Sequence, residues 1–351
     1  MLKYIHIGYP KCFSTTLQRS FFDAHPDILH LGIGCGSNVG YADAHLAAYM
    51  ENYLIYARHF AWMEEEAAIK AHFNQWFSKA ADDGYVAVGI SLEHIVFSFT
   101  TDNIDTREKA LRLRDIFLED TRILMVVRNQ LDLLKSLYRE SVRTGNPGSF
   151  NDYLQFCVFL KDRNFVYDFR YDLVYDLYSE LFGQQNICVL VMEELRDADG
   201  HLVRDADGKS LLSSQLLNFL DLNANFEVDG HFNIALSNET VERKVHLNKE
   251  FRHDLGNDMY GRGVSFHRLN DYLNLTFPSR LSEAFIHADV ITKRASIQKA
   301  SESTLQAQPQ NQYDQWLWDY LDEFYISGNR QFERQINRVL PAQFFGLTTE
   351  V

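Results

Sequence analysis

The chain has 351 residues, of which 46% are hydrophobic and 23% charged, so it can form a large core and does not have the composition of a disordered chain. Its formal net charge of −14 argues against nucleic acid or an acidic membrane surface as a partner. No apolar run approaches the length of a membrane span, and the first predicted strand leaves no room for a signal peptide, so we expect a cytoplasmic protein.

The first predicted element is a strand over Tyr4–Gly8, which a turn connects to the start of a helix. The turn carries Lys11, and three hydroxyl residues stand where the helix begins: Ser14, Thr15 and Thr16. A helix N-terminus offers unpaired N–H groups and the positive end of a dipole, and Lys11 adds a full charge. These residues predict a site for a phosphate-like or sulfate-like anion. The same positive surroundings are expected to lower the thiol pKa of Cys12, whose main contribution would be its backbone N–H.

A glycine-rich stretch and a long helical stretch follow. Gly32–Gly40 does not match the spacing of a dinucleotide-binding fingerprint, and we interpret it as a loop beside the first helix. Between about 43 and 82, apolar residues recur every three or four positions, which predicts a helical insertion with one buried face. The residues of that face are Leu46, Met50, Tyr53, Ala57, Phe60 and Met63.

A second strand is predicted over Tyr85–Ile90, and two titratable residues, Glu93 and His94, follow its end. If the strand continued, alternation would place Ser91 and Glu93 on one side and His94 on the other. Ligands bind at the carboxyl edge of parallel sheets, so both residues are candidates for a site beside Lys11. The alternative is a packed histidine and an ion-paired glutamate.

The apolar run Ile123–Val127 is typical of a buried parallel strand, and Arg128 stands at its end. Ser136 comes eight residues later, in a helix predicted over Leu131–Arg143. A guanidinium binds phosphate with two parallel hydrogen bonds, and a serine hydroxyl can add a third. Arg128 therefore stands at the carboxyl edge of the predicted sheet, where ligands bind in open α/β folds.

The later elements continue the alternation of helix and strand. A fourth strand is predicted over Ile187–Met192, and a repeated Arg-Asp-Ala-Asp-Gly sequence at 196–200 and 204–208 predicts two turns. Further helices are predicted over Arg107–Leu118, Phe150–Leu160 and Leu211–Leu220. This order favours an α/β fold with a parallel sheet flanked by helices.

The motifs at 10–17 and 128–136 resemble those of the sulfotransferases that use 3′-phosphoadenosine 5′-phosphosulfate (PAPS), in particular bacterial and carbohydrate-type members. The first is similar to the family's 5′-phosphosulfate loop and the second to its 3′-phosphate motif. Phe13 departs from the first pattern, where a small residue is usual, and Gln130 replaces a proline in the second. Tyr325–Arg330 also resembles a C-terminal segment of bacterial members.

The resemblance implies a P-loop-like α/β sulfotransferase fold with additional helices, formed by one domain over residues 1–351. That domain would include the helical insertion at about 43–82 and a C-terminal helical region at about 240–351. The residues that the resemblance places around the nucleotide are Lys11, Cys12, Phe13, Ser14, Thr15, Thr16, Arg128 and Ser136.

The resemblance also implies in-line transfer of a sulfuryl group from PAPS to a hydroxyl, or an amine, of a carbohydrate, glycolipid or small-molecule acceptor. PAP (3′-phosphoadenosine 5′-phosphate) is then the product, and no metal is expected. Lys11 would neutralise the leaving phosphate, while Arg128 and Ser136 would hold the 3′-phosphate. Glu93 is the favoured general base and His94 the alternative.

Two other interpretations stay open. A P-loop-like small-molecule kinase would need a carboxylate such as Glu193 or Glu194 to hold magnesium, but the sequence lacks the Gly-Lys-Ser/Thr of that class at the loop. A non-catalytic nucleotide-binding protein with the same fold is favoured by Phe13 in the loop. The sequence selects neither the acceptor nor the oligomeric state.

Overall fold

The structure is a computed structural model. It describes residues 1–34, 40–97, 104–144, 146–163, 165–197, 201–222, 226–228, 237–250 and 314–345. Within these residues, no helix is long and apolar enough to cross a membrane.

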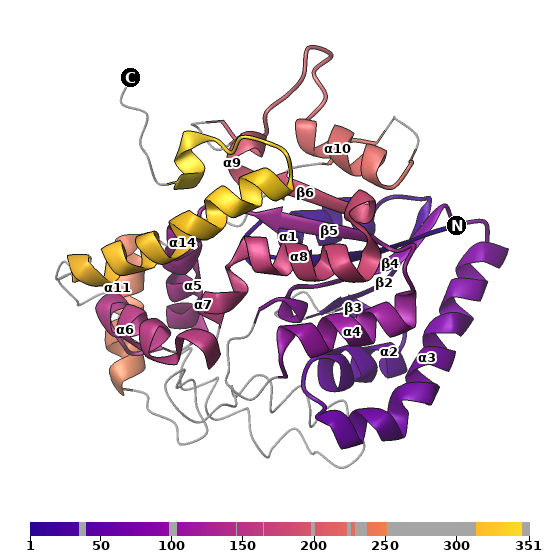
Figure 1. The fold of residues 1–351 in the computed structure, drawn as a ribbon, viewed down its shortest axis with the longest axis horizontal. Helices are drawn as coiled ribbons and strands as arrows, with labels where there is room; N and C mark the ends of the chain where they lie inside the picture. The colour runs from indigo at the N-terminus through magenta and orange to yellow at the C-terminus, as the bar shows by residue number, and fades with distance from the viewer. Residues whose placement is uncertain are drawn as a thin grey trace.

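A mostly parallel sheet of six strands forms the centre of the described part of the chain (Figure 1). Its strands are β1 (Leu2–Gly8), β2 (Ile28–Gly34), β3 (Gly40–Tyr41), β4 (Ala87–Leu92), β5 (Arg122–Val127) and β6 (Ile187–Val191). Their order across the sheet is β3-β2-β4-β1-β5-β6, and β3 is antiparallel to β2 while the other pairs are parallel. The central strands β1, β4 and β5 are almost entirely buried, as is usual for a parallel sheet covered on both faces.

Helices connect the strands and follow the last one. They are α1 (Ser14–Leu17), α2 (Ala44–Ala48), α3 (His59–Asp82), α4 (Thr106–Phe117), α5 (Gln130–Thr144), α6 (Phe150–Leu160), α7 (Phe165–Asp168), α8 (Tyr171–Phe182), α9 (Met192–Leu195), α10 (Leu211–Phe219), α11 (Asn238–Glu250) and α14 (Gln315–Gln335). Wider or tighter helical turns are η1 (Gln18–Phe22), η3 (Tyr49–Leu54), η4 (Glu93–Ile95), η5 (Lys161–Arg163), η6 (Gln184–Asn186) and η7 (Ala342–Phe345).

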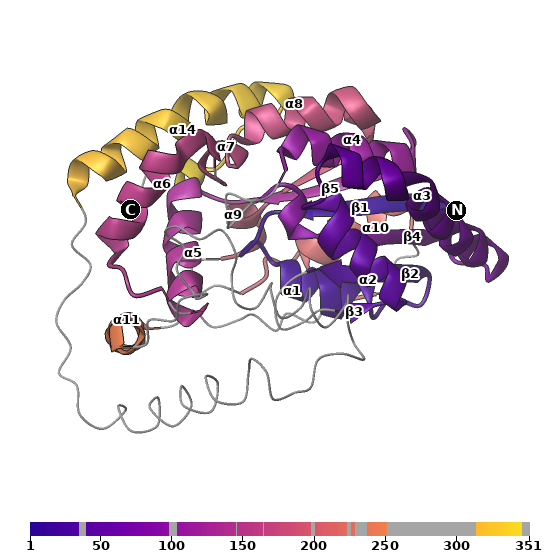
Figure 2. The ribbon, with the colours of Figure 1, turned by 90° about the horizontal axis from the view of Figure 1, so that it is seen from below.

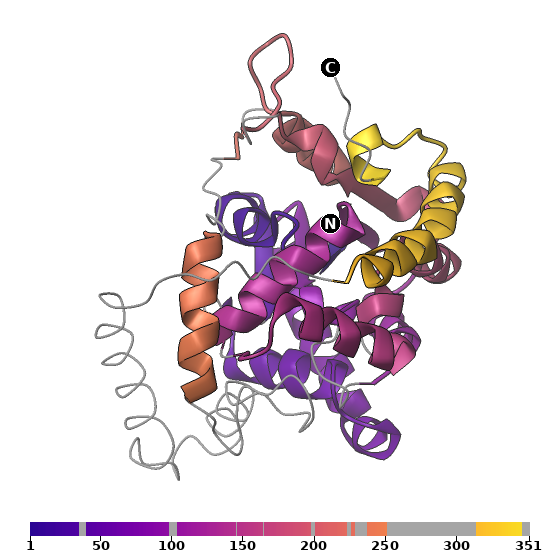
Figure 3. The same cartoon turned by 90° about the vertical axis from the view of Figure 1, so that its left-hand side faces the viewer.

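The helices cover both faces of the sheet, so the predicted α/β fold class is confirmed. Figure 2 shows α4, α8 and α14 on one side of the strands and α1 on the other. The helix α5 leaves the end of β5, and Figure 3 shows α11 and α14 on opposite sides of the molecule. Both helices contact α5, which places α5 between them.

Gly89 allows the central strands β1 and β4 to pack closely, because it pairs with Tyr4 in the sheet. A Cβ atom at Gly89 would lie 2.1 Å from the carbonyl oxygen of Tyr4. We expect Gly89→Ala to lower the free energy of unfolding by about 1–3 kcal/mol, since the backbone must shift. Chemical denaturation measures this change, and Gly40→Ala is the matched control because, chain neighbours aside, no heavy atom of the described residues lies within 4 Å of its added Cβ. Equal stability of the two variants would contradict the close packing.

The four predicted strands are present, with ends that differ by one or two residues, but the interpretation of Gly32–Gly40 as a loop is wrong in part. Gly32 lies in β2, opposite Tyr41 of β3. A Cβ at Gly32 would lie 2.4 Å from the Tyr41 ring, so the glycine leaves room for that ring. Glycine is rare in strands, which is why the sequence indicated a loop here. Residues 35–39 of this stretch lie outside the described residues.

The stretch from 43 to 82 is helical, as predicted, but it does not form one continuous buried face. Leu46 and Met50 are buried, whereas Phe60 and Met63 are 81% and 58% exposed. The chain leaves the helical path between η3 and α3, so the spacing of buried positions restarts at α3. The buried residues of α3 are Trp62, Ile69, Phe73, Phe77 and Ala80.

The region predicted to be helical from about 240 to the end contains α11 and α14. The remainder of that prediction between 251 and 313 lies outside the described residues. Tyr325–Arg330, which resembles a segment of bacterial sulfotransferases, lies within α14.

Candidate active site

The residues predicted around Lys11, Glu93 and Arg128 lie together at the carboxyl edge of the sheet. Because β1 lies between β4 and β5, the loop after β1 runs between η4 and the start of α5. Arg128 Nη1 donates to the backbone oxygen of Lys11 at 3.3 Å. The Lys11 charge also acts on the Glu93 carboxyl, which places all three at one site.

The loop from Tyr9 to Phe13 holds two non-glycine residues in the left-handed region. Lys11 has φ 60° and Phe13 has φ 61°. Such residues cost about 1–2 kcal/mol each and are concentrated at ligand sites. The loop then enters α1, a single turn that continues into η1, with Ser14 and Thr16 buried at its start. The hydroxyl residues and the lysine therefore lie around one tight loop, as predicted.

The Lys11 side chain forms an ion pair with a residue that the sequence analysis did not select. Lys11 Nζ lies 2.8 Å from Glu140 Oε2, and both side chains are partly exposed. Arg143 Nε donates to the other oxygen of Glu140 at 3.0 Å. These two cations hold the pKa of Glu140 below its ordinary value despite partial burial, so Glu140 is ionised and fixes the direction of Lys11.

Glu140 is one helical turn beyond Ser136 on α5, so both residues lie on the same face of that helix. That face meets the Lys11 loop through Glu140. Ser136 is partly buried. Its position is suitable for an anion ligand, and its role stays a prediction.

Arg128 is positioned by its backbone as well as by its side chain. The Tyr171 hydroxyl donates to the Arg128 backbone oxygen at 2.9 Å. Arg128 Nε is buried and has no hydrogen-bond partner among the described residues. An unpaired buried guanidinium N–H costs about 1–3 kcal/mol, and a bound anion would satisfy it.

Gln130, which replaces the proline of the resembled motif, connects the start of α5 to the C-terminal helix α14. Gln130 Nε2 donates to Asn329 Oδ1 at 2.6 Å, and Asn329 Nδ2 donates back to Gln130 Oε1 at 3.0 Å. Beside it, Asn129 Nδ2 donates to the Phe344 backbone oxygen, while Asn129 Oδ1 accepts from the Asp132 N–H. Buried, satisfied polar pairs of this kind fix the backbone that carries Arg128.

Glu93 and His94 lie in η4, because β4 ends one residue before them. Strand alternation therefore does not place them. The Ser14 hydroxyl donates to the Glu93 carboxylate. Burial raises the pKa of Glu93, although Ser14 and Lys11 act in the opposite direction. A raised carboxyl pKa is the direction that suits a general base.

The turn that carries Glu93 and His94 rests on a buried lysine. Lys109 Nζ donates to the His94 backbone oxygen at 2.8 Å. Burial lowers the pKa of Lys109 to about 8, against the attraction of Asp168. The His94 ring lies 6.1 Å from that of Phe97.

The expectation that this loop lowers the thiol pKa of Cys12 is wrong. Cys12 is fully buried, and burial raises its pKa by more than the nearby Arg128 and Arg196 lower it. The thiol is therefore protonated and packs as a small apolar group. A role for the Cys12 backbone N–H stays a prediction.

Arg196 is a site residue that sequence reasoning missed. Its Cζ lies 4.3 Å from the centroid of the Phe13 ring, and Phe13 is only 6% exposed. Arg196 belongs to the first Arg-Asp-Ala-Asp-Gly copy, and Arg204 is its equivalent in the second. Arg204 is more exposed and pairs with Glu227 at 3.0 Å. The sequence held one signal that could have pointed to Arg196: a bulky Phe13 in the loop, together with an arginine directly after the Met192–Leu195 segment.

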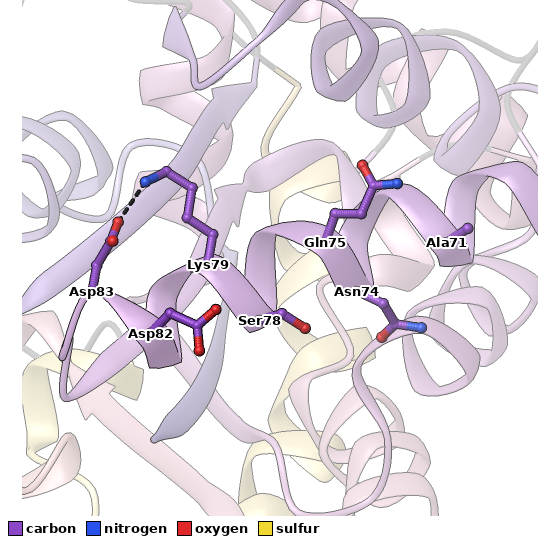
Figure 4. A pocket seen from close by; sticks show the side chains of 7 residues that line it. All are labelled: Ala71, Asn74, Gln75, Ser78, Lys79, Asp82 and Asp83. Atoms are coloured by element: carbon purple, nitrogen blue, oxygen red, sulfur yellow. Dashed lines mark hydrogen bonds and ion pairs between the residues drawn. The ribbon is translucent and has the colours of Figure 1, made fainter.

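A hollow elsewhere in the described part of the chain does not belong to this site. Figure 4 shows its lining along α3. The residues around it are Ala71, Asn74, Gln75, Ser78, Lys79, Asp82 and Asp83. They come from one helix and its end, which leads to the start of β4, so the hollow lies toward the amino edge of the sheet. Among the described residues, no group of three or more His, Cys, Asp or Glu is placed to hold a metal ion.

No family model matches the sequence, and no curated protein matches it. Among solved structures, the chain is similar to the crystal structure of a sulfotransferase from Alicyclobacillus acidocaldarius. The two are 15% identical, the likeness covers 98% of both chains, and the TM-score is 0.50. At this identity the likeness shows the fold alone, so the chain has an α/β fold that is also found in a sulfotransferase.

Proposed function

We propose that this chain is a sulfotransferase that transfers a sulfuryl group from PAPS to a hydroxyl, or an amine, of a carbohydrate, glycolipid or small-molecule acceptor. The observation that carries the proposal is the contact between Arg128 and the Lys11 loop at the carboxyl edge. It brings together the two motifs that resemble the phosphosulfate and 3′-phosphate sites of that family. The likeness of fold to a sulfotransferase supports the same conclusion.

The residues at the edge are chemically suited to a nucleotide with two separate anionic groups. The Lys11 loop, with Ser14, Thr15 and Thr16, would hold the phosphosulfate end. Arg128 and Ser136 would hold the 3′-phosphate. Binding two anions at two cationic positions would select PAPS over AMP, which has only one.

In the proposed reaction the acceptor oxygen forms a bond to sulfur while the bond from sulfur to the phosphate oxygen breaks. The electron pair of that bond stays on PAP, and Lys11 stabilises the negative charge that develops there. Glu93 takes the acceptor proton. Lys11 lies near Glu93 and pairs with Glu140, so its charge is directed toward the reacting groups before the donor arrives.

If Glu93 is the base, kcat/KM should rise with pH as its carboxyl ionises, with the midpoint above the ordinary glutamate pKa because burial raises it. Glu93→Gln should remove this acid limb and lower kcat by about 10²–10⁴-fold. His94→Asn is the matched comparison and should leave the limb in place. Loss of the limb in the histidine variant and its retention in Glu93→Gln would assign the base to His94.

The carboxylates offered for a kinase already have structural partners. Glu193 Oε1 accepts from the Asn129 N–H at 2.7 Å, and Glu194 lies 3.4 Å from Arg338. These contacts favour a scaffolding role for both residues. Phe13, which favoured a non-catalytic protein, packs under Arg196.

Calorimetric titration with PAP, AMP and magnesium-ATP tests the proposal. We expect PAP to bind at least about tenfold more tightly than AMP, since each charge-assisted contact to phosphate contributes about 1.5–3 kcal/mol. PAPS turnover with a panel of acceptors should follow. Preference for magnesium-ATP would support the kinase instead, and tight PAP binding without turnover would support the non-catalytic protein.

A further inference from the structure

The described structure holds a second guanidinium close to Arg128. Arg196 is fixed by a short antiparallel pairing with Leu202 and by the neighbouring hydrogen bond from the Asp197 N–H to the His201 oxygen, 2.9 Å long. This pairing begins directly after α9, so Arg196 reaches the carboxyl edge from the β6 side. The Lys11 side chain lies on the other side of the loop, where it pairs with Glu140 of α5 and its charge acts on Glu93, which follows β4.

Phe13 provides the surface on which Arg196 lies. The guanidinium carbon is 4.3 Å from the ring centroid, and a stacked guanidinium directs its N–H groups outward in its own plane. Phe13 stands immediately before α1, at the position where the resembled loop has a small residue. The Phe13 ring therefore holds the Arg196 guanidinium at the loop, which adds a third positive charge to those of Lys11 and Arg128.

Arg128 and Arg196 carry like charges near one another. Burial, together with repulsion from Arg128, lowers the pKa of Arg196 to about 10. Both guanidiniums also act on the buried Cys12 thiol, which places them on the same part of the loop. Two partly buried guanidiniums that repel each other form a favourable site for a dianion. The anion offsets their repulsion and accepts hydrogen bonds from the N–H groups of both.

We propose that Arg196 and Arg128 together bind the 3′-phosphate of the donor nucleotide, with the Phe13 ring orienting Arg196. This inference rests on the proposed function and adds a binding residue to it. A 3′-phosphate carries up to two charges and three free oxygens, which suits two guanidinium forks and leaves an oxygen for Ser136. Phe13 is then part of the nucleotide site through its ring rather than an obstacle to it.

The test compares Arg196→Met with the wild-type protein in calorimetric titrations with PAP and AMP. We expect PAP affinity to fall about 10- to 100-fold, while AMP affinity changes less than about threefold. Arg163→Met is the matched control, because Arg163 of η5 also lies over a ring, with its Cζ 5.5 Å from the Phe159 centroid, and its loss should leave both affinities unchanged. Phe13→Leu removes the stacking ring and should produce a smaller loss that is again confined to PAP.

The unfolding temperature of the nucleotide-free variants separates binding from structure. Arg196→Met removes one of the two charges that repel each other. The nucleotide-free variant should therefore unfold at the wild-type temperature or above it. Equal losses for PAP and AMP, unchanged PAP affinity, or a lower unfolding temperature than that of Arg163→Met would each overturn the inference. A wild-type protein that does not prefer PAP over AMP would instead refute the proposed function itself.

Discussion

Replacing Lys11 by alanine should lower sulfuryl transfer by about 10²–10³-fold, the usual effect of removing one preorganised charge from a developing anion. Lys11 is the lysine of the loop and already points into the site through its 2.8 Å contact with Glu140. The measurement is the rate of PAP release from PAPS with an acceptor identified by screening. Turnover close to the wild-type rate would contradict the assignment of this loop.

The fold should survive this change. Glu140 keeps its contact with Arg143, so the variant does not leave an isolated buried charge. Lys135→Ala is the control. Lys135 lies on α5, as Glu140 does, pairs with Asp132 at 3.2 Å and is more exposed than Lys11. We expect both variants to unfold at nearly the wild-type temperature and only Lys11→Ala to lose activity.

The second large effect is expected from Arg128→Ala, which should weaken PAP binding by about 10²-fold or more and AMP binding much less. The reason is that Arg128 Nε is buried without a hydrogen-bond partner in the part of the chain that the structure describes, and that Arg128 lies against the Lys11 loop. Titration of the variant with both nucleotides measures the difference. Equal losses for the two would show that Arg128 supports the loop and does not read the 3′-phosphate.

Combining this variant with Arg196→Met adds a further check. If both guanidiniums bind one phosphate, the double variant should lose less affinity for PAP than the sum of the single losses in free energy. The free-energy effects of substituting two residues that contact a shared partner are coupled, whereas the effects at independent sites add up. Strict additivity would place the two arginines on different groups.

The sequence predicted the central sheet well because its strands are short, continuous apolar runs. Ile123–Val127 matches β5 except for one residue, and Arg128 stands at its end as expected. It did not predict β2, since Gly32 near its end is required by a neighbour in space, Tyr41, that no local pattern reveals. Local periodicity likewise continued through the break before α3 and placed Phe60 and Met63 inside.

The candidate site divides in the same way. Lys11, Arg128 and Glu93 stand at strand ends, and the topology alone brings them to one edge. Glu140 and Arg196 take their places from tertiary contacts, the first through a helix face and the second through its antiparallel pairing with Leu202. Glu140 belongs to no motif that the sequence analysis selected, and the repeat that contains Arg196 was interpreted as a turn. The direction of the Cys12 pKa shift was wrong for a related reason, because burial was not visible in the sequence.

The bonds that fix the Arg128 segment have a consequence for how the protein is made. Asn129 and Gln130 are held by Phe344 and Asn329, which follow them in the chain by 215 and 199 residues. During synthesis the sheet strands leave the ribosome long before these partners exist. Closing such distant contacts is also slow, because the intervening chain must lose its freedom first. The segment that carries Arg128 therefore lacks these two partners until translation has passed Phe344 and α14 has docked.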